Sequence, residues 1–156
     1  MQIEDTRASH HRVSLVAALA GVLLAGAGIM SPAWADLPPL QHQGAVTYVS
    51  GGIGIDESTS FKQAMSQYPL SLTFAQQDGK VGAYLADVKV VISNARHDKV
   101  LDTTAQGPYM LVKLPPGRYQ VKATFNHETK TRDVTIGKKG SERLMFEWKS
   151  VASANT

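Results

Sequence analysis

The chain has 156 residues, with 16 lysines and arginines, 13 aspartates and glutamates, and no cysteine. Disulfide-stapled folds, cysteine nucleophiles and lipid anchors attached through cysteine are therefore excluded. The net charge is +3, and the charged residues are scattered along the chain without forming a basic stripe, so we expect no nucleic-acid binding.

The N-terminal segment has the three parts of a secretory signal peptide. Two arginines precede an uncharged run over residues 13–30, and Ala33 and Ala35 supply the small side chains that a signal peptidase requires. This pattern predicts export to the periplasm and cleavage after Ala35, which removes residues 1–35 and leaves no membrane span. The alternative is an uncleaved anchor, because the uncharged run is close to the shortest length that spans a bilayer.

The next part of the chain contains one predicted helix. Residues 36–43 include two prolines and predict an extended lead-in, and residues 44–49 predict a short strand. Apolar residues then recur at helical spacing, which predicts one amphipathic helix over 57–67 that the following proline ends. Asp56 or Ser58 is expected to cap this helix at its N-terminus.

From residue 70 onward, apolar and polar residues alternate with a period of two. Such alternation is typical of antiparallel strands with one buried and one wet face. The alternation places Tyr84 and Trp148 on the inward side, and the strand predicted at 44–49 places Tyr48 there as well. With the strand at 44–49, the pattern predicts a mainly β fold, a seven-stranded antiparallel β-sandwich with one short flanking helix. The alternating segments are 70–74, 84–93, 110–114, 118–125, 134–136 and 144–149.

One motif carries a family resemblance. In GPYMLVKLPPGRYQV (residues 107–121), Pro116 and Gly117 suit the central positions of a type II turn, after which Tyr119 is expected to point into the sandwich. The motif resembles that of the carboxypeptidase regulatory-like domain, a transthyretin-like β-sandwich. The residues that stand in the family's positions are Gly107, Tyr109 or Leu111, Leu114, Pro116, Gly117, Tyr119 and Val121.

The resemblance extends over residues 82–136, because 86–92 and 99–103 are similar to two strands of the same family. It implies a transthyretin- or immunoglobulin-like sandwich within a domain over 36–149, followed by a flexible tail over 150–156. The predicted helix and its glycine-rich lead-in resemble an elaboration found in small periplasmic proteins of Gram-negative bacteria. The family implies a fold, and roles in folding support, adhesion or binding, rather than one activity.

No catalytic or metal-binding motif stands out. The mature part holds only His42, His97 and His127, and none has a Glu or His at the spacing that zinc ligands require. There is no Gly-x-Ser-x-Gly elbow for a serine nucleophile. We therefore expect no enzyme, no cofactor and no metal site, although two histidines in distant loops could still meet in space and hold a metal.

The segment around the predicted helix start is the first candidate for a binding site, because loops on a rigid sandwich commonly carry function. The chain is expected to be an exported, monomeric, non-catalytic binding or accessory protein whose partner is an envelope protein or a glycan. Tyr109 is added as an aromatic side chain expected to be partly exposed. Two alternatives remain: a structural subunit that pairs by edge strands, and a metal-dependent hydrolase assembled from distant loops. The candidate binding residues are Gly51, Gly52, Gly54, Asp56, Glu57 and Tyr109.

Overall fold

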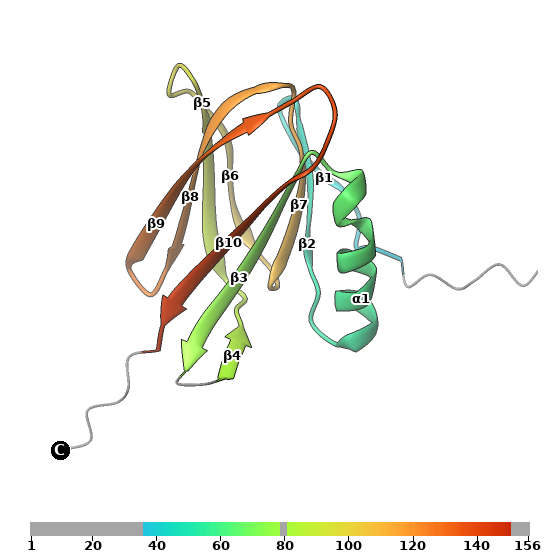
Figure 1. The fold of residues 1–156 in the computed structure, drawn as a ribbon, viewed down its shortest axis with the longest axis vertical. Coiled ribbons are helices and arrows are strands. Elements are labelled where there is room, and N and C mark those ends of the chain that lie inside the picture. Colours follow the sequence, from blue (N-terminus) through green and yellow to red (C-terminus); the bar gives the residue numbers. More distant parts are fainter. Residues whose placement is uncertain (1–35, 79–80, 151–156) are drawn as a thin grey trace, which may run out of the picture. The chain divides into compact units, whose positions relative to one another are not determined.

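The structure is a computed structural model and describes residues 36–78 and 81–150 (Figure 1). The predicted signal peptide, and the predicted tail beyond Ser150, lie outside the described residues. The elements are β1 (Gln41–Gln43), β2 (Val46–Gly51), α1 (Ile55–Ala64), the 3-10 turn η1 (Met65–Gln67), β3 (Leu70–Asp78), β4 (Val81–Tyr84), β5 (Val88–Asn94), β6 (Lys99–Ala105), β7 (Tyr109–Lys113), β8 (Gly117–Phe125), β9 (Glu128–Ile136) and β10 (Glu142–Lys149).

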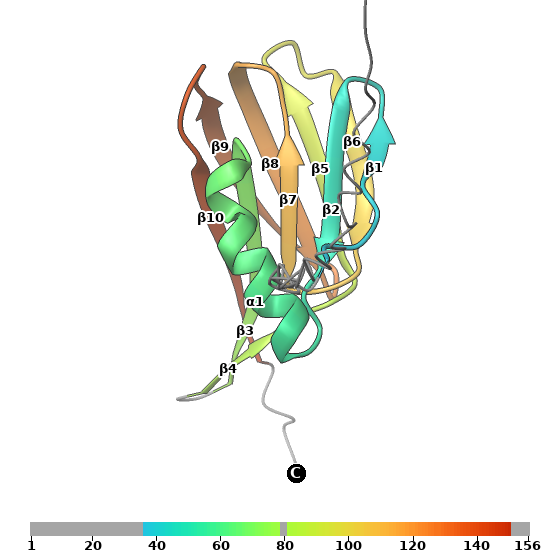
Figure 2. The same ribbon diagram turned by 90° about the vertical axis from the view of Figure 1, so that its right-hand side faces the viewer.

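The strands form two sheets that face each other (Figures 1 and 2). Sheet A has the order β1-β2-β7-β3-β10, and sheet B the order β6-β5-β8-β9. Within sheet A, the first half of β3 pairs with β7, and the second half pairs with β4. The fold is therefore mainly β with two sheets and one short helix, as the alternating pattern predicted.

The strand count and the all-antiparallel arrangement were predicted wrongly. The described residues contain ten strands rather than seven, and β10 runs parallel to β3, with Glu142 opposite Leu70 and Lys149 opposite Gln77. The parallel pair arises because the chain leaves sheet B after β9, crosses at one end of the sandwich and enters sheet A beside β3 (Figure 1). No local pattern in the sequence encodes such a crossing.

The predicted strand over 84–93 is two strands in different sheets. Tyr84 ends β4 in sheet A, and Val88 begins β5 in sheet B. Between them, Asp87 has a left-handed φ of 59°, and its backbone N–H donates to the carbonyl of Ala105. Because the chain changes sheet here, the alternation does not keep one face: Tyr84 lies 58 % exposed instead of in the core.

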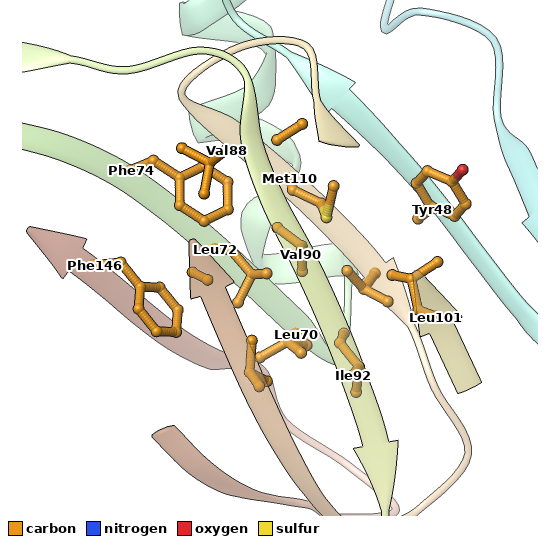
Figure 3. Close-up of a cluster of buried hydrophobic side chains, with 14 of the residues drawn as sticks. Tyr48, Leu70, Leu72, Phe74, Val88, Val90, Ile92, Leu101, Met110 and Phe146 are labelled. Atoms are coloured by element: carbon orange, nitrogen blue, oxygen red, sulfur yellow. The ribbon is translucent and has the colours of Figure 1, made fainter. Parts of the chain in front are cut away.

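The main core fills the space between the two sheets (Figure 3). Alternate residues of β3 and β5 point into it, and each is fully buried in the described structure. Phe74 and Phe146 stack with ring centroids 6.1 Å apart, so β10 is packed into the same core through its own inward residues. The fully buried residues on β3 and β5 are Leu70, Leu72, Phe74, Val88, Val90 and Ile92.

Side-chain hydrogen bonds join the sheets along both long sides. On one side, Trp148 Nε1 on β10 donates to the carbonyl of Glu128 on β9, at 3.1 Å. On the other side, the backbone N–H of Asp102 on β6 donates to Gln43 Oε1 on β1, at 2.6 Å. These bonds hold the outer strands of one sheet against those of the other.

Helix α1 covers the outer face of sheet A (Figure 2). Phe61 and Met65 pack there against Val49 on β2 and Leu111 on β7, in a second apolar cluster separate from the main core. Leu37 also packs against this cluster, so the predicted lead-in is partly docked rather than loose, and its last three residues form β1. Sheet A is therefore buried on both faces where the helix lies.

The helix was predicted, but it begins two residues earlier than expected, and the prediction that Asp56 or Ser58 caps it was wrong. It begins at Ile55 after Gly54, which has a φ of 97° and supplies no side-chain hydrogen bond. Asp56 and Glu57 fall in the first turn, where negative charge favours a helix, and the Ser58 hydroxyl donates to the carbonyl of Ile55. Over 36–78 and 81–150, no helix has the length and apolar character needed to cross a bilayer.

Candidate functional site

In the predicted glycine-rich segment, Gly51 and Gly52 serve mainly to allow close packing. A Cβ at Gly51 would overlap the Glu57 carboxylate and lie 3.1 Å from the Phe61 ring, and a Cβ at Gly52 would overlap the ring of Tyr109. Gly52 also has a φ of 95°, which other residues rarely adopt. Both glycines are buried, so they allow the start of α1 and the Tyr109 ring to approach the end of β2.

The remaining residues of the segment are more accessible. Gly54 and Asp56 are exposed, and Glu57 is half-buried. The structure does bring part of the candidate set together, since Glu57 lies against Gly51 and Tyr109 against Gly52. Asp56, in contrast, faces solvent at the first turn of α1.

Tyr109 is buried, not partly exposed as predicted. Its ring stacks on Phe61 with centroids 6.1 Å apart and lies tilted against Tyr84 at 5.4 Å. Burial, together with the neighbouring Tyr84 phenol, raises the pKa of Tyr109 far above its ordinary value. Its hydroxyl oxygen has no hydrogen-bond partner among the described residues. The ring packing explains the burial, because β7 turns Tyr109 towards the helix.

A cavity of about 560 Å³ lies at the other end of the sandwich. This turn end is formed by the β1–β2 turn (44–45), the β5–β6 turn (95–98) and the β7–β8 link (114–116). Residues from all of these neighbourhoods line the cavity, and its volume falls in the range of small-molecule sites. The apolar part of the lining is Val46, Val100, Leu114, Pro115 and Tyr119.

The polar part of the lining is an ion pair and two amides. Lys99 Nζ lies 2.6 Å from Asp102 Oδ2, and Lys89 lies 3.9 Å from the other carboxylate oxygen. The hydrogen bond from Lys99 holds the pKa of Asp102 below its ordinary value, and the charges of Lys89 and Lys99 act in the same direction. Gln43 and Asn94 add the amides.

Tyr119 lies between this cavity and a second one of about 470 Å³, which is lined by the β5–β6 turn and by β8 and β9. Its ring is half-buried against the main core, as predicted, and its hydroxyl donates to the carbonyl of Pro115 at 2.8 Å. The predicted type II turn is absent here: Gly117 has a φ of 158° instead of about +80° and already begins β8. The Pro-Gly motif is an extended entry into the strand.

The loop histidines do not meet. His97 lies in the β5–β6 turn and His127 in the β8–β9 turn, at opposite ends of β8. Nine strand residues separate these ends, a distance of more than about 20 Å. His42 Nδ1 lies 3.0 Å from Thr47 Oγ1. Within the part of the chain that the structure describes, no three His, Cys, Asp or Glu side chains are placed to share a metal ion.

The chain matches no protein-family model and no curated protein significantly. The resemblance to the carboxypeptidase regulatory-like domain therefore rests on the sequence patterns at 86–92, 99–103 and 107–121 alone.

The turn-end cavity was not anticipated from the sequence. Its lining comes from segments far apart in the chain, such as Val46, Val100 and Leu114, and each of these residues alone is an ordinary strand-end hydrophobe. Only the Pro-Gly-x-Tyr stretch pointed to this end of the molecule, and it did so as a turn rather than as the wall of a cavity.

Proposed function

We propose that the chain is an exported, non-catalytic binding or accessory protein of the cell envelope, built on a carboxypeptidase regulatory-like β-sandwich. The observation that carries the proposal is the turn-end cavity of about 560 Å³, which opens between turns held by a rigid pair of sheets. Loops placed on such a scaffold commonly bind ligands.

The lining of the cavity favours a ligand with both apolar and polar faces, such as a sugar ring or a side chain of a partner protein. Val100, Leu114 and Pro115 offer apolar contacts, and Gln43 and Asn94 offer amide donors and acceptors. A glycan or an envelope protein is accordingly the class of partner that we propose.

The proposal is tested by titrating purified protein with soluble oligosaccharides that contain N-acetylated sugars, and with peptides from envelope proteins, while recording backbone amide resonances. We expect concentration-dependent shifts at residues of the turn end. Ala45, an exposed residue of the lining, permits a blocking variant: Ala45→Trp should abolish these shifts.

Ala95→Trp is the matched control, because Ala95 is an exposed turn residue at the same end that lines the second cavity only. It should bind as the wild type does. Shifts that survive Ala45→Trp unchanged, or that fall outside the turn end, would contradict the proposal.

A second candidate function is a structural subunit that pairs by its edges. It is favoured by β10, an eight-residue strand that ends sheet A and pairs along one side only within the described residues. Unpaired strand edges of this length invite the addition of another strand.

A further inference from the structure

The outer face of sheet A carries a second feature, at the end opposite the turn-end cavity. Here α1 starts and β4 ends, and both views place these segments at the same end of the sandwich (Figures 1 and 2). Three large apolar side chains that belong to these segments are exposed: Ile53 at 66 %, Ile55 at 85 % and Tyr84 at 58 %. They leave an apolar surface beside the helix.

A buried phenol lies beneath this surface. Tyr109 is 2 % exposed, and its hydroxyl makes no hydrogen bond of 3.5 Å or less in the described part of the chain, although the nearby Tyr84 phenol interacts with it weakly and raises its pKa further. Leaving a buried donor unpaired costs free energy, which an acceptor supplied from outside would recover. Because burial raises the pKa of Tyr109, the phenol stays protonated near neutral pH and can donate a hydrogen bond to such an acceptor, most strongly when the acceptor is an anion.

The ammonium group of Lys62 lies over the rings of Tyr109 and Tyr84. Lys62 Nζ lies 5.8 Å from the centroid of the Tyr109 ring and 6.0 Å from that of Tyr84. Lys62 follows Ile55 by two helical turns, so both project from one face of α1. Among the described residues, no carboxylate lies within ion-pair distance of Lys62, so its charge is available to a ligand, as it is for most of the lysines and arginines other than Lys89, Arg96, Lys99 and Lys130.

The geometry points to a binding site for a carboxylate carried on an apolar group, formed by Lys62, Tyr84 and Tyr109 and bordered by Ile53 and Ile55. The ammonium supplies the opposite charge, and the Tyr109 hydroxyl supplies a donor that lacks an acceptor. The exposed isoleucines and the Tyr84 ring cover the apolar part of the ligand. Charge-assisted hydrogen bonds of this kind are about twice as strong as neutral ones.

The charge balance favours a carboxylate over a phosphate. The site has one cation, Lys62, which neutralises the single charge of a carboxylate but leaves a doubly charged phosphate with an uncompensated charge. A free carboxylic acid with an alkyl chain and the C-terminus of an apolar peptide share the required chemistry. This site is independent of the proposed turn-end cavity, since Tyr109 and Tyr119 lie at opposite ends of the sandwich.

The test uses two pairs of probes: octanoate against octanamide, and a short apolar peptide with a free against an amidated C-terminus. The affinity of the purified protein for each is measured by titration of amide resonances. We expect the acid of at least one pair to bind at least tenfold more tightly than its amide. Preference for octanoate identifies a free acid, and preference confined to the peptide identifies a chain end; equal affinity within both pairs, or no binding, overturns the proposal.

Variants locate the site. Lys62→Met should weaken binding of the acid at least tenfold, whereas Lys113→Met should leave it unchanged. Lys113 is the matched control, because its ammonium lies 5.1 Å over another ring, that of Tyr68. Unchanged affinity in Lys62→Met, or an equal loss in both variants, overturns the assignment.

Tyr109→Phe separates binding from folding. It removes the unpaired hydroxyl and keeps the ring that stacks on Phe61, so the melting temperature should stay the same or rise while affinity for the acid falls. Tyr119→Phe, which breaks a hydrogen bond to Pro115, should instead lower the melting temperature and leave the affinity unchanged. A fall in melting temperature in Tyr109→Phe would show that its hydroxyl is already satisfied and would overturn the proposal.

Discussion

Gly107 lies just before β7 and packs against Gly51, the last residue of β2. A Cβ added there would overlap the carbonyl group of Gly51 and lie 2.8 Å from its Cα, and all of these are backbone atoms that cannot rotate away. The glycine at this position therefore answers a steric need, which also gives a physical reason for the first residue of the family-like motif.

Gly107→Ala should lower the free energy of unfolding by about 1–3 kcal/mol, because the overlap forces β2 or the segment before β7 to shift. Denaturant titration measures this change. The control is Gly82→Ala on β4, where a Cβ would meet no atom within 4 Å and the change should stay within about 0.5 kcal/mol. Equal effects of the two substitutions would contradict the steric explanation.

The ionisation of Asp102 is expected to change the free energy of unfolding with pH. Its folded-state pKa is lowered, first by the hydrogen bond from Lys99, so its contribution is present above the unfolded pKa of about 3.9 and is lost as the pH falls through the folded value. The carboxylate is partly exposed, so solvent screens the effect.

Lys99→Met should raise the pKa of Asp102 towards the ordinary value and make the loss of stability below about pH 4 less steep. The carboxyl carbon shift of Asp102 followed against pH measures the pKa directly. Lys138→Met, in the exposed loop before β10, serves as control and should leave this titration unchanged. An unaltered Asp102 titration in Lys99→Met would refute the pairing.

At the scale of single elements, β6 is an edge strand with a protected backbone. The Gln43 amide accepts from the N–H of Asp102 at 2.6 Å and donates to its carbonyl at 3.5 Å, and thus acts as one residue of a neighbouring strand. Proteins commonly block sheet edges in such ways to avoid unwanted pairing.

Gln43→Ala should speed hydrogen exchange at the Asp102 amide about fivefold to tenfold, as expected for the loss of one hydrogen bond of about 1 kcal/mol. Exchange recorded residue by residue measures this. In Gln120→Ala, which removes only a side-chain bond to Asp133, the Asp102 amide should exchange at the wild-type rate. Undiminished protection in Gln43→Ala would show that the amide contact does not persist in solution.

The elements that sequence patterns predicted are those whose burial is regular along the strand. In 144–149, and in the middle of 118–125, the more buried residues alternate with exposed ones in the structure as in the pattern. β1 was missed because its three residues, Gln41–Gln43, are all polar and exposed. The break at Asp87 was missed because the apolar alternation continues across a change of sheet.

The candidate site, too, was only partly predictable from the sequence. Gly51 and Gly52 stood out because glycine is conspicuous in a sequence, but their role depends on Glu57, Phe61 and Tyr109, which only the tertiary fold brings there. The alternation correctly placed Trp148 in the core, yet it could not show that Tyr109 faces the helix on the outer side of its sheet.

At the scale of the whole molecule, the open edge of β10 decides between a binding protein and an assembly subunit. We expect one species with the mass of a monomer in sedimentation velocity runs at rising protein concentration, because β9 packs beside β10 and Trp148 bonds across to it. Growth into larger species with concentration would contradict this and favour pairing through β10.

The predicted export of the chain is checked at its N-terminus. Protein recovered from the periplasm should begin at Asp36, which sequencing or mass measurement would show. Cleavage there retains Leu37, which packs against the outer-face cluster. Recovery of a chain that still carries residues 1–35, in the membrane fraction, would show the anchor alternative to be correct.

The parallel pairing of β10 with β3 also sets when this protein can fold. Because Phe146 and Trp148 fill the main core and lie opposite Phe74 and Gln76, the core stays unfinished until nearly the last described residue has left the ribosome. Contacts between segments so distant in sequence form slowly. The predicted export would suit this order of events, because a chain whose core is unfinished can still be threaded through a translocation channel.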